Sequence, residues 1–165
     1  MPDDRAIAVV DIDGVVADVR HRLHHLRRRP KDWRAFFAEA GDDPPHPEGL
    51  AVVEQLAAEH EIVFLTGRPQ HLRDVTARWL DDNGIGGHRL VMRPAGDGRP
   101  AAELKVRLLR EVAAGRRVAV VVDDDAAVIA AMGDAGLPTF LADWEPRDDD
   151  DERTLRAAQQ QEGKT

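Results

Sequence analysis

The sequence predicts an α/β fold in which a central parallel sheet of about five strands is covered by helices on both faces. Short apolar runs rich in β-branched residues alternate with longer segments of helical periodicity, which is typical of this arrangement. Three of the apolar runs, at 6–10, 62–65 and 118–122, have no polar face and are expected to be buried on both sides. At 165 residues the chain suits one domain with a substantial core.

The first half of the chain alternates between strand and helix signals around one irregular segment. Asp32 can cap a helix whose Trp33, Phe36 and Phe37 form one apolar face. A run that contains glycine and proline then breaks the chain. In order, we expect a strand at 6–10, a loop or short helical turn at 14–29, a helix at 32–40, a break at 41–45, a helix at 47–59 and a strand at 62–65.

The second half continues the alternation. Leu72, Val75 and Trp79 recur at helical spacing, as do Leu104 and Leu108. We expect a helix at 70–81, a turn at 83–87, a strand at 89–92, a loop at 93–100, a helix at 101–114, a strand at 118–122, a helix at 126–134 and a strand at 138–141.

The domain is expected to span 1–142 and to be followed by a C-terminal tail at 143–165. The tail is acidic and then glutamine-rich, so it either adds one helix at about 152–161 or stays partly disordered. Its acidic run at 148–151 is expected to be solvated. Residues 163–165, Gly-Lys-Thr, are similar to the end of a phosphate-binding loop, but no strand precedes them and we interpret the likeness as coincidence.

The composition excludes several classes of function. The chain has no cysteine, which excludes disulfides, thiol catalysis and cysteine-ligated zinc. We see no signal-peptide pattern, and no apolar run approaches the roughly 20 residues of a membrane span, so we expect a cytoplasmic protein without a membrane partner. A net charge of −8 argues against a general affinity for nucleic acid.

The first strand run ends in two carboxylates, Asp11 and Asp13, with Gly14 after them. Strand alternation aims both side chains toward the same side. A carboxylate fixed at the end of a strand can act as a nucleophile toward phosphorus, and its neighbour can protonate the leaving oxygen and later activate water. The second role needs a raised pKa, which nearby like charges would favour. The alternative is a pair of aspartates that form a turn or cap a helix.

The second strand run is followed by groups that suit phosphate. Thr66, Gly67 and Arg68 offer a hydroxyl, the backbone amides of a small-residue turn and a guanidinium that can bind two oxygens at once. In open α/β sheets, ligands bind just beyond the carboxyl ends of the strands. These three residues are therefore expected to share one site with the two aspartates of the first strand, although alone they could form an ordinary turn.

The fourth strand run ends in three aspartates. Asp123 and Asp124 add oxygens suited to Mg²⁺, whereas Asp125 is expected to cap the next helix. Lys105, in the first turns of the helix at 101–114, could neutralise the cluster of carboxylates and phosphate. It is the only lysine between residues 31 and 164 of an arginine-rich chain, which indicates that a compact point charge is needed there. The alternative is a solvated surface lysine.

In this order, Asp-x-Asp-Gly, Thr-Gly-Arg, a lysine and Asp-Asp resemble the motifs of the haloacid-dehalogenase (HAD) superfamily, in its phosphatase branch. The resemblance implies a Rossmann-like sheet and an aspartyl-phosphate formed on Asp11 with Mg²⁺ bound. It implies that Asp13 is the general acid/base and that Thr66 and Lys105 bind phosphate. Dehalogenating members lack the second aspartate, so its presence favours phosphate chemistry. The implied metal ligands are Asp124, supported by Asp123, together with Asp11 and the main-chain oxygen of Asp13.

Segments 11–18, 66–68, 76–80 and 90–93, followed by Gly96-Asp97, resemble the phosphatase half of phage-type polynucleotide kinases, which remove 3′-phosphates from nucleic acid ends. This finer resemblance covers about residues 7 to 141. It implies that Arg68 also binds phosphate and that no large cap covers the site, with 14–46 as a partial flap. Two positions differ from that group: Val15 stands where threonine is common, and Asp125 stands where arginine is usual.

The basic stretch 19–31 is the main indication of a substrate, because it holds six arginine or lysine residues, three histidines and no acid. One interpretation is an arm whose Arg20, His21 and Arg22 contact the phosphates of a nucleotide or nucleic acid end. The alternative is a solvated helix face whose leucines pack while its arginines face water. The histidines are not expected to bind metal, because the aspartates already account for it.

The sequence therefore predicts a magnesium-dependent phosphomonoesterase that acts on nucleic acid 3′-ends or on nucleotides. A phosphatase of the same fold that acts on a small metabolite is an alternative. A receiver-type signalling domain is a second alternative, since it also uses aspartates, a hydroxyl, a lysine and magnesium. The motif order disfavours the receiver, because its lysine would follow all of its acidic groups.

Overall fold

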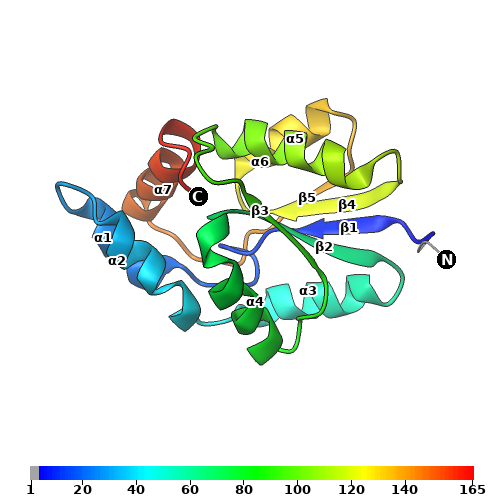
Figure 1. Cartoon of the computed structure of the whole chain (residues 1–165), viewed down its shortest axis with the longest axis horizontal. Helices are drawn as coiled ribbons and strands as arrows, with labels where there is room; N and C mark the ends of the chain where they lie inside the picture. Colours follow the sequence, from blue (N-terminus) through cyan, green and yellow to red (C-terminus); the bar gives the residue numbers. More distant parts are fainter. Residues whose placement is uncertain (1–3) are drawn as a thin grey trace.

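A computed structural model describes residues 4–165 and contains one five-stranded parallel sheet with the strand order β3-β2-β1-β4-β5 (Figure 1). The prediction of a parallel α/β fold with about five strands is confirmed. Receiver domains have the order 2-1-3-4-5, so the topology contradicts that alternative. The strands are β1 (Ile7–Val10), β2 (Glu61–Pro69), β3 (Arg89–Arg93), β4 (Val118–Asp123) and β5 (Thr139–Leu141).

Helices cover both faces of the sheet because alternate strand residues point in opposite directions. On one face, Ala8, Val10 and Phe64 pack against α3 and α4, and on the other, Val9 and Val63 pack against α5 and α6. Figure 1 shows these two helical layers on either side of the strands. The helices, with 3₁₀ turns labelled η, are η1 (Arg20–Arg22), α1 (His24–Arg27), α2 (Trp33–Ala38), η2 (Ala40–Asp42), α3 (Pro47–Ala57), η3 (Gln70–Leu72), α4 (Arg73–Asp82), α5 (Ala101–Ala113), α6 (Ala126–Asp134) and α7 (Asp149–Arg156), followed by the π-helical turn η4 (Ala157–Gln161).

Local sequence signals set several of these boundaries. The Asp32 carboxylate accepts a hydrogen bond from the Ala35 amide and caps α2, as predicted. Asp125 caps α6 in the same way through the Ala127 amide. Helix α3 begins with Pro47, whose missing N–H costs nothing at the first helical position.

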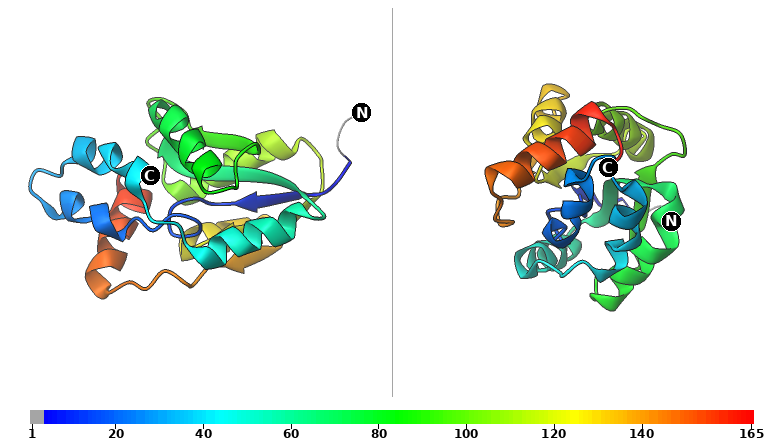
Figure 2. Two further views of the ribbon diagram at one scale, coloured as in Figure 1. Left: turned by 90° about the horizontal axis from the view of Figure 1, so that it is seen from below. Right: turned by 90° about the vertical axis from the view of Figure 1, so that its left-hand side faces the viewer.

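The segment between β1 and α3 forms a helical flap at the carboxyl ends of the strands (Figure 2). Its irregular first part was expected to be a loop or a short helical turn, and it contains the short elements η1 and α1. Leu23, Leu26 and Phe36 form a small core of their own beneath it. The flap is thus a packed unit that lies over the edge of the sheet where ligands bind in such folds.

The C-terminal residues complete this small core instead of forming a loose tail. The helical alternative is the one observed, and α7 begins three residues earlier than expected because Asp148 and Asp151 form a capping box. The carboxylates at 148–150 are exposed, as predicted, and their negative charge is favourable at a helix N-terminus, whereas the prediction is wrong for Asp151, which is half-buried and pairs with Arg27. Leu155 and Ala158 are buried against the flap, which is the reason for the ordered helix.

Within residues 4–165, no helix combines the length and the apolar character that crossing a bilayer would require.

Candidate active site

The carboxyl ends of the strands bring the predicted residues together. Asp11 and Asp13 follow β1, Asp123 ends β4, and Thr66, Gly67 and Arg68 lie within β2. The stretch 66–68 was expected to be a turn, but β2 continues through it to Pro69 with an irregular register against β3 after Leu65. The predicted site residues that this edge brings together are Asp11, Asp13, Thr66, Gly67, Arg68, Lys105, Asp123 and Asp124.

Lys105 is a buried cation between two buried carboxylates. Its Nζ lies 2.9 Å from Asp11 Oδ1 and 2.7 Å from Asp123 Oδ2, so the solvated-surface alternative is wrong. Burial disfavours the charged amine, but the two carboxylates outweigh it and raise the pKa of Lys105 above its usual value. Burial and the nearby Asp123 raise the pKa of Asp11 well above its ordinary value, against the opposing effect of Lys105.

Substitution of Lys105 tests its role in the site, and α5 also offers a control residue. We expect Lys105→Ala to lower kcat/KM by about 10²- to 10³-fold at neutral pH, because removing a preorganised charge has this order of effect. Without the cation, the pKa of Asp11 rises further, so less carboxylate is ionised and part of the loss should be recovered as pH increases. The control is Arg107→Ala, which removes a half-exposed cation from the outer face of α5. A flat pH profile with near-normal kinetics would assign Lys105 no part in the site.

Asp13 has a different environment from Asp11. Its Oδ1 lies 2.8 Å from Arg68 Nε, 2.6 Å from Arg68 Nη2 and 3.4 Å from Arg22 Nη2. Burial alone would raise the pKa of Asp13, but the two guanidinium groups lower it below its ordinary value. The expectation of a raised pKa is therefore wrong in this arrangement, because the neighbours that matter most are cations and not the other aspartates.

Asp43 is a site residue that the sequence did not reveal, since it lies in a run that reads only as a chain break. Its carboxylate has no exposed surface and accepts hydrogen bonds from Arg22 Nε and Nη2, at 2.8 and 2.9 Å, and from Arg68 Nη2, at 2.7 Å. His21 Nε2 lies 2.7 Å from the same carboxylate, and Trp79 Nε1 donates to the Asp43 carbonyl. Asp43 therefore holds both arginines that contact Asp13.

The basic stretch separates into distinct roles. Arg22 is buried, with its guanidinium 4.3 Å from the centroid of the Phe36 ring, and it contacts Asp13 directly. Arg20, in contrast, pairs with Asp18 and donates to the Pro146 carbonyl. The solvated-face interpretation is thus wrong for Arg22, which belongs to the site, whereas a contact between Arg20 or His21 and substrate stays a prediction.

A divalent cation fits the carboxylates on the other side of Asp11. Oxygens of Asp11, Asp123 and Asp124 lie within 4.8 Å of one another. Asp123 uses both of its oxygens, with Lys105 and with the Asp125 amide, whereas Asp124 Oδ1 is buried and has no hydrogen-bond partner among residues 4–165. A buried, unpartnered carboxylate oxygen beside a second carboxylate is a suitable ligand set for Mg²⁺, which prefers one or two carboxylates.

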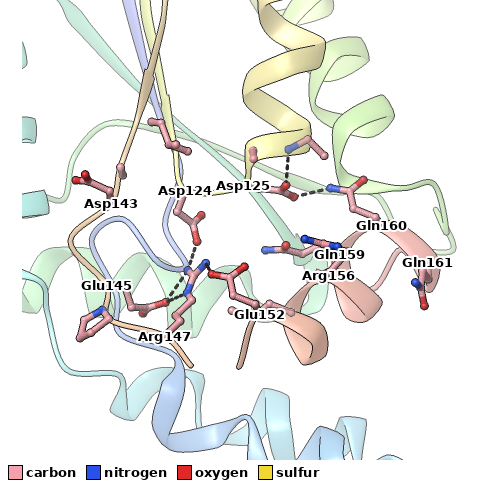
Figure 3. Close-up of a pocket in the computed structure, with 16 residues that line it drawn as sticks. Asp124, Asp125, Asp143, Glu145, Arg147, Glu152, Arg156, Gln159, Gln160 and Gln161 are labelled. Carbon is pink, nitrogen blue, oxygen red and sulfur yellow. Dashed lines mark hydrogen bonds and ion pairs between the residues drawn. The ribbon is translucent and has the colours of Figure 1, made fainter. Parts of the chain in front are cut away.

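Arg147, a further residue that the sequence did not reveal, closes the outer side of this acidic group. It donates to Asp124 Oδ2 and to Glu145 Oε2, and its side chain is largely buried (Figure 3). Beyond it lies a cavity of about 720 Å³ between the end of β4 and α7, where Asp125 accepts a hydrogen bond from Gln160. No local signal connects Arg147 to the site, because Asp124, the partner that places it there, lies 23 residues away in the sequence.

Known proteins are similar to this chain in sequence and in fold. The family model of the polynucleotide kinase PNKP phosphatase domain matches residues 5–144. A chain of the Pnkp1/Rnl/Hen1 complex aligns over 89% of this chain with a TM-score of 0.73 and 21% identity, and a chain of the Pnkp1/Rnl/Hen1 RNA repair complex aligns over 86% with a TM-score of 0.69 and 22% identity. The present chain spans 49% and 43% of those two chains, about half of their length.

More distant structures share the fold alone. The HAD-hydrolase YfnB from Bacillus subtilis, in a magnesium-bound structure, aligns over 83% of this chain and 88% of its own, with a TM-score of 0.56 and 11% identity. A haloacid dehalogenase-like hydrolase from Streptococcus pneumoniae aligns over 92% of this chain and 91% of its own, with a TM-score of 0.59 and 10% identity. No curated protein matches the sequence.

Proposed function

Because the chain belongs to the family of polynucleotide kinase PNKP phosphatase domains, within the HAD-like hydrolases, we propose that it is a magnesium-dependent phosphomonoesterase with Asp11 as its nucleophile. One observation carries the proposal. The Asp11 carboxylate is fixed between the cation Lys105 and the unpartnered oxygen of Asp124, with Asp13 two residues away at the same strand end.

In the proposed mechanism, a carboxylate oxygen of Asp11 attacks phosphorus while the bond to the leaving oxygen breaks. Asp13 gives a proton to that oxygen, which requires that the negative charge of the bound phosphomonoester raises the pKa of Asp13 above the low value that Arg68 and Arg22 give it in the free site. Asp13 then takes a proton from water, which attacks the aspartyl-phosphate and releases inorganic phosphate and free Asp11. Arg68 and Arg22 orient Asp13 for both proton transfers, and Lys105 offsets the charge around Asp11.

Mg²⁺ would be held by Asp11 and Asp124, with Asp123 in support and the main-chain oxygen of Asp13 as a further ligand. When bound, it would supply positive charge that stabilises the phosphoryl group. The phosphate oxygens themselves are assigned to the Thr66 hydroxyl, to the backbone of Gly67 and to the cationic side chains of Arg68 and Lys105.

We further assign the substrate as a nucleic acid 3′-phosphate end or a nucleotide. The family match supports this assignment, as does a site bordered by a small flap instead of a large cap domain. The overall charge of −8 favours recognition of an end over binding along a strand, since extended phosphate backbones attract basic surfaces.

A substrate panel tests the proposal. We expect phosphate release from 3′-phosphorylated oligonucleotides or from nucleoside monophosphates to exceed that from 5′-phosphorylated oligonucleotides and sugar phosphates by about tenfold or more in kcat/KM. Activity should disappear with EDTA and return with Mg²⁺. The control protein is Asp11→Asn, which excludes a contaminating phosphatase. Preference for sugar phosphates would contradict the nucleic acid assignment, and full activity in EDTA would contradict the metal.

A further inference from the structure

Residues 163–165, here called the strap, lie at the same edge of the sheet as the catalytic residues. Thr165 is buried, its hydroxyl donates to Asp13 Oδ2 at 3.3 Å, and its carbonyl accepts from Arg93 Nη2 at 3.3 Å. A Cβ placed on Gly67 would lie 2.3 Å from the Thr165 carbonyl carbon, so the strap also touches the proposed phosphate-binding residues. In Figure 1 the C-terminus lies beside α7, at the end of the sheet toward which the strands point.

The strap is held along its path. The Lys164 amide donates to the Ala158 carbonyl at 2.9 Å, and Glu162, the residue directly before the strap, forms an ion pair with Lys31 of the flap. Gly163 has a φ of +58°, and a Cβ there would lie 2.1 Å from the Gly98 carbonyl oxygen. Only glycine allows the backbone to pass this point, so the position of the strap is specified by the sequence around it.

The strap lies where a substrate would need to be. The acid/base candidate Asp13 must face the leaving oxygen of a phosphomonoester, and the Thr165 hydroxyl takes that position. Asp11 and Thr66, which a phosphoryl group must reach, are both almost fully buried. The match to the family ends at residue 144, so α7 and the strap lie outside the part of the chain that resembles the family.

We propose that the strap is an intramolecular competitor that occupies the leaving-group side of the phosphatase site and withdraws when a phosphomonoester binds. This inference rests on the proposed function and adds regulation to the same site. A ligand that binds only when the strap is withdrawn has a weakened apparent affinity. Its apparent dissociation constant is the intrinsic one divided by the fraction of molecules in which the strap is withdrawn. Anything that weakens the docking of the strap should therefore strengthen binding at the site without changing a catalytic group.

Gly163→Ala tests the strap directly, because the new Cβ meets the Gly98 carbonyl and must displace the backbone. Gly136→Ala is the matched control: Gly136 has a φ of +80° and no atom of the described part of the chain lies within 4 Å of its Cβ position, so the same conformational penalty arises without a collision. Thr165→Ala is the milder variant, since it removes the hydroxyl that reaches Asp13 together with the γ-methyl group and introduces no collision with the backbone.

Two measurements on the full chain apply, the dissociation constant of inorganic phosphate in the presence of Mg²⁺ and the amide hydrogen exchange of residues 157–165. Loss of two hydrogen bonds should shift the docking equilibrium about tenfold, so phosphate should bind about tenfold more tightly to Gly163→Ala and about threefold more tightly to Thr165→Ala. The Gly136→Ala control should match the unmodified chain. Exchange at 157–165 should accelerate in Gly163→Ala, and in the unmodified chain when phosphate is added.

Unchanged phosphate affinity in both strap variants would overturn the inference, as would exchange in the unmodified chain that phosphate leaves unaltered. No phosphate binding by any variant would also count against it. If Gly163→Ala fails to fold, Thr165→Ala decides the outcome alone. Tighter phosphate binding without hydrolysis of any ester would support the strap and count against the proposed function, so the two failures are distinguishable.

Discussion

Replacing Asp11 by asparagine should lower kcat by at least about 10³-fold, because the amide oxygen cannot form the acyl phosphate and loss of a nucleophile is among the largest single-residue effects. The fold should survive the change. Burial and the nearby carboxylates of Asp123 and Asp124 already disfavour ionised Asp11, so removing its charge relieves repulsion while Lys105 keeps its bond to Asp123. We expect the free energy of unfolding to change by less than about 1 kcal/mol.

The measurement is phosphate release alongside chemical denaturation for both proteins. Asp125→Asn is the matched control, since it makes the same chemical change in the neighbouring acidic run, where asparagine can still cap α6 through the Ala127 amide. The control should retain activity. More than one per cent of normal activity in Asp11→Asn would remove Asp11 as the nucleophile.

The second large effect is on stability. Asp43→Ala should lower the free energy of unfolding by about 3–5 kcal/mol, because it removes one of the two carboxylates that pair with both Arg22 and Arg68 and leaves two buried guanidinium groups with Asp13 alone. Activity should fall with it, since the two arginines position Asp13 and a displacement of about 1 Å can cost about 10²-fold in rate.

Denaturation curves and steady-state kinetics test this prediction. Asp42→Ala removes the adjacent, exposed carboxylate and should change the unfolding free energy by less than about 0.5 kcal/mol. If the alanine variant does not fold, Asp43→Asn keeps the volume and one acceptor and should show a lower kcat with a folded spectrum. Wild-type stability in Asp43→Ala would show that Asp13 and water suffice for the two arginines.

Much of the candidate active site at the carboxyl ends of the strands could be predicted from local sequence. Asp11, Thr66 and Asp123 each come directly after or within an apolar run that can only be a buried strand, and parallel strands place their carboxyl ends together. The helix caps at Asp32 and Asp125 are equally local, because a carboxylate reaches an amide two or three residues away. These features needed no knowledge of distant contacts.

Local sequence did not reveal which charged side chains of the flap are buried, or which partners they have. Arg22 lies in a stretch that reads as a solvated basic face, and Asp43 lies in a chain break, yet the two pair with each other across 21 residues, and Asp43 also pairs with Arg68 across 25. The low pKa of Asp13 has the same origin, since it depends on which cations the fold delivers to one carboxylate. Burial of a charge is favourable only when its partner is supplied, and the partner here comes from another element.

By itself, the sequence determined the fold class and the strand-end carboxylates, because periodicity and strand direction are properties of short segments, and it named Lys105 only as a candidate that the structure then placed between two of them. Only the tertiary structure decided that Asp43 and Arg22 hold Asp13, that Arg147 faces Asp124, and that residues 163–165 reach the site. The physical reason is that these contacts join segments whose own residues show no preference for each other. They form because the flap packs against α7 and the sheet. This packing buries oppositely charged side chains next to each other and brings distant backbone segments into contact.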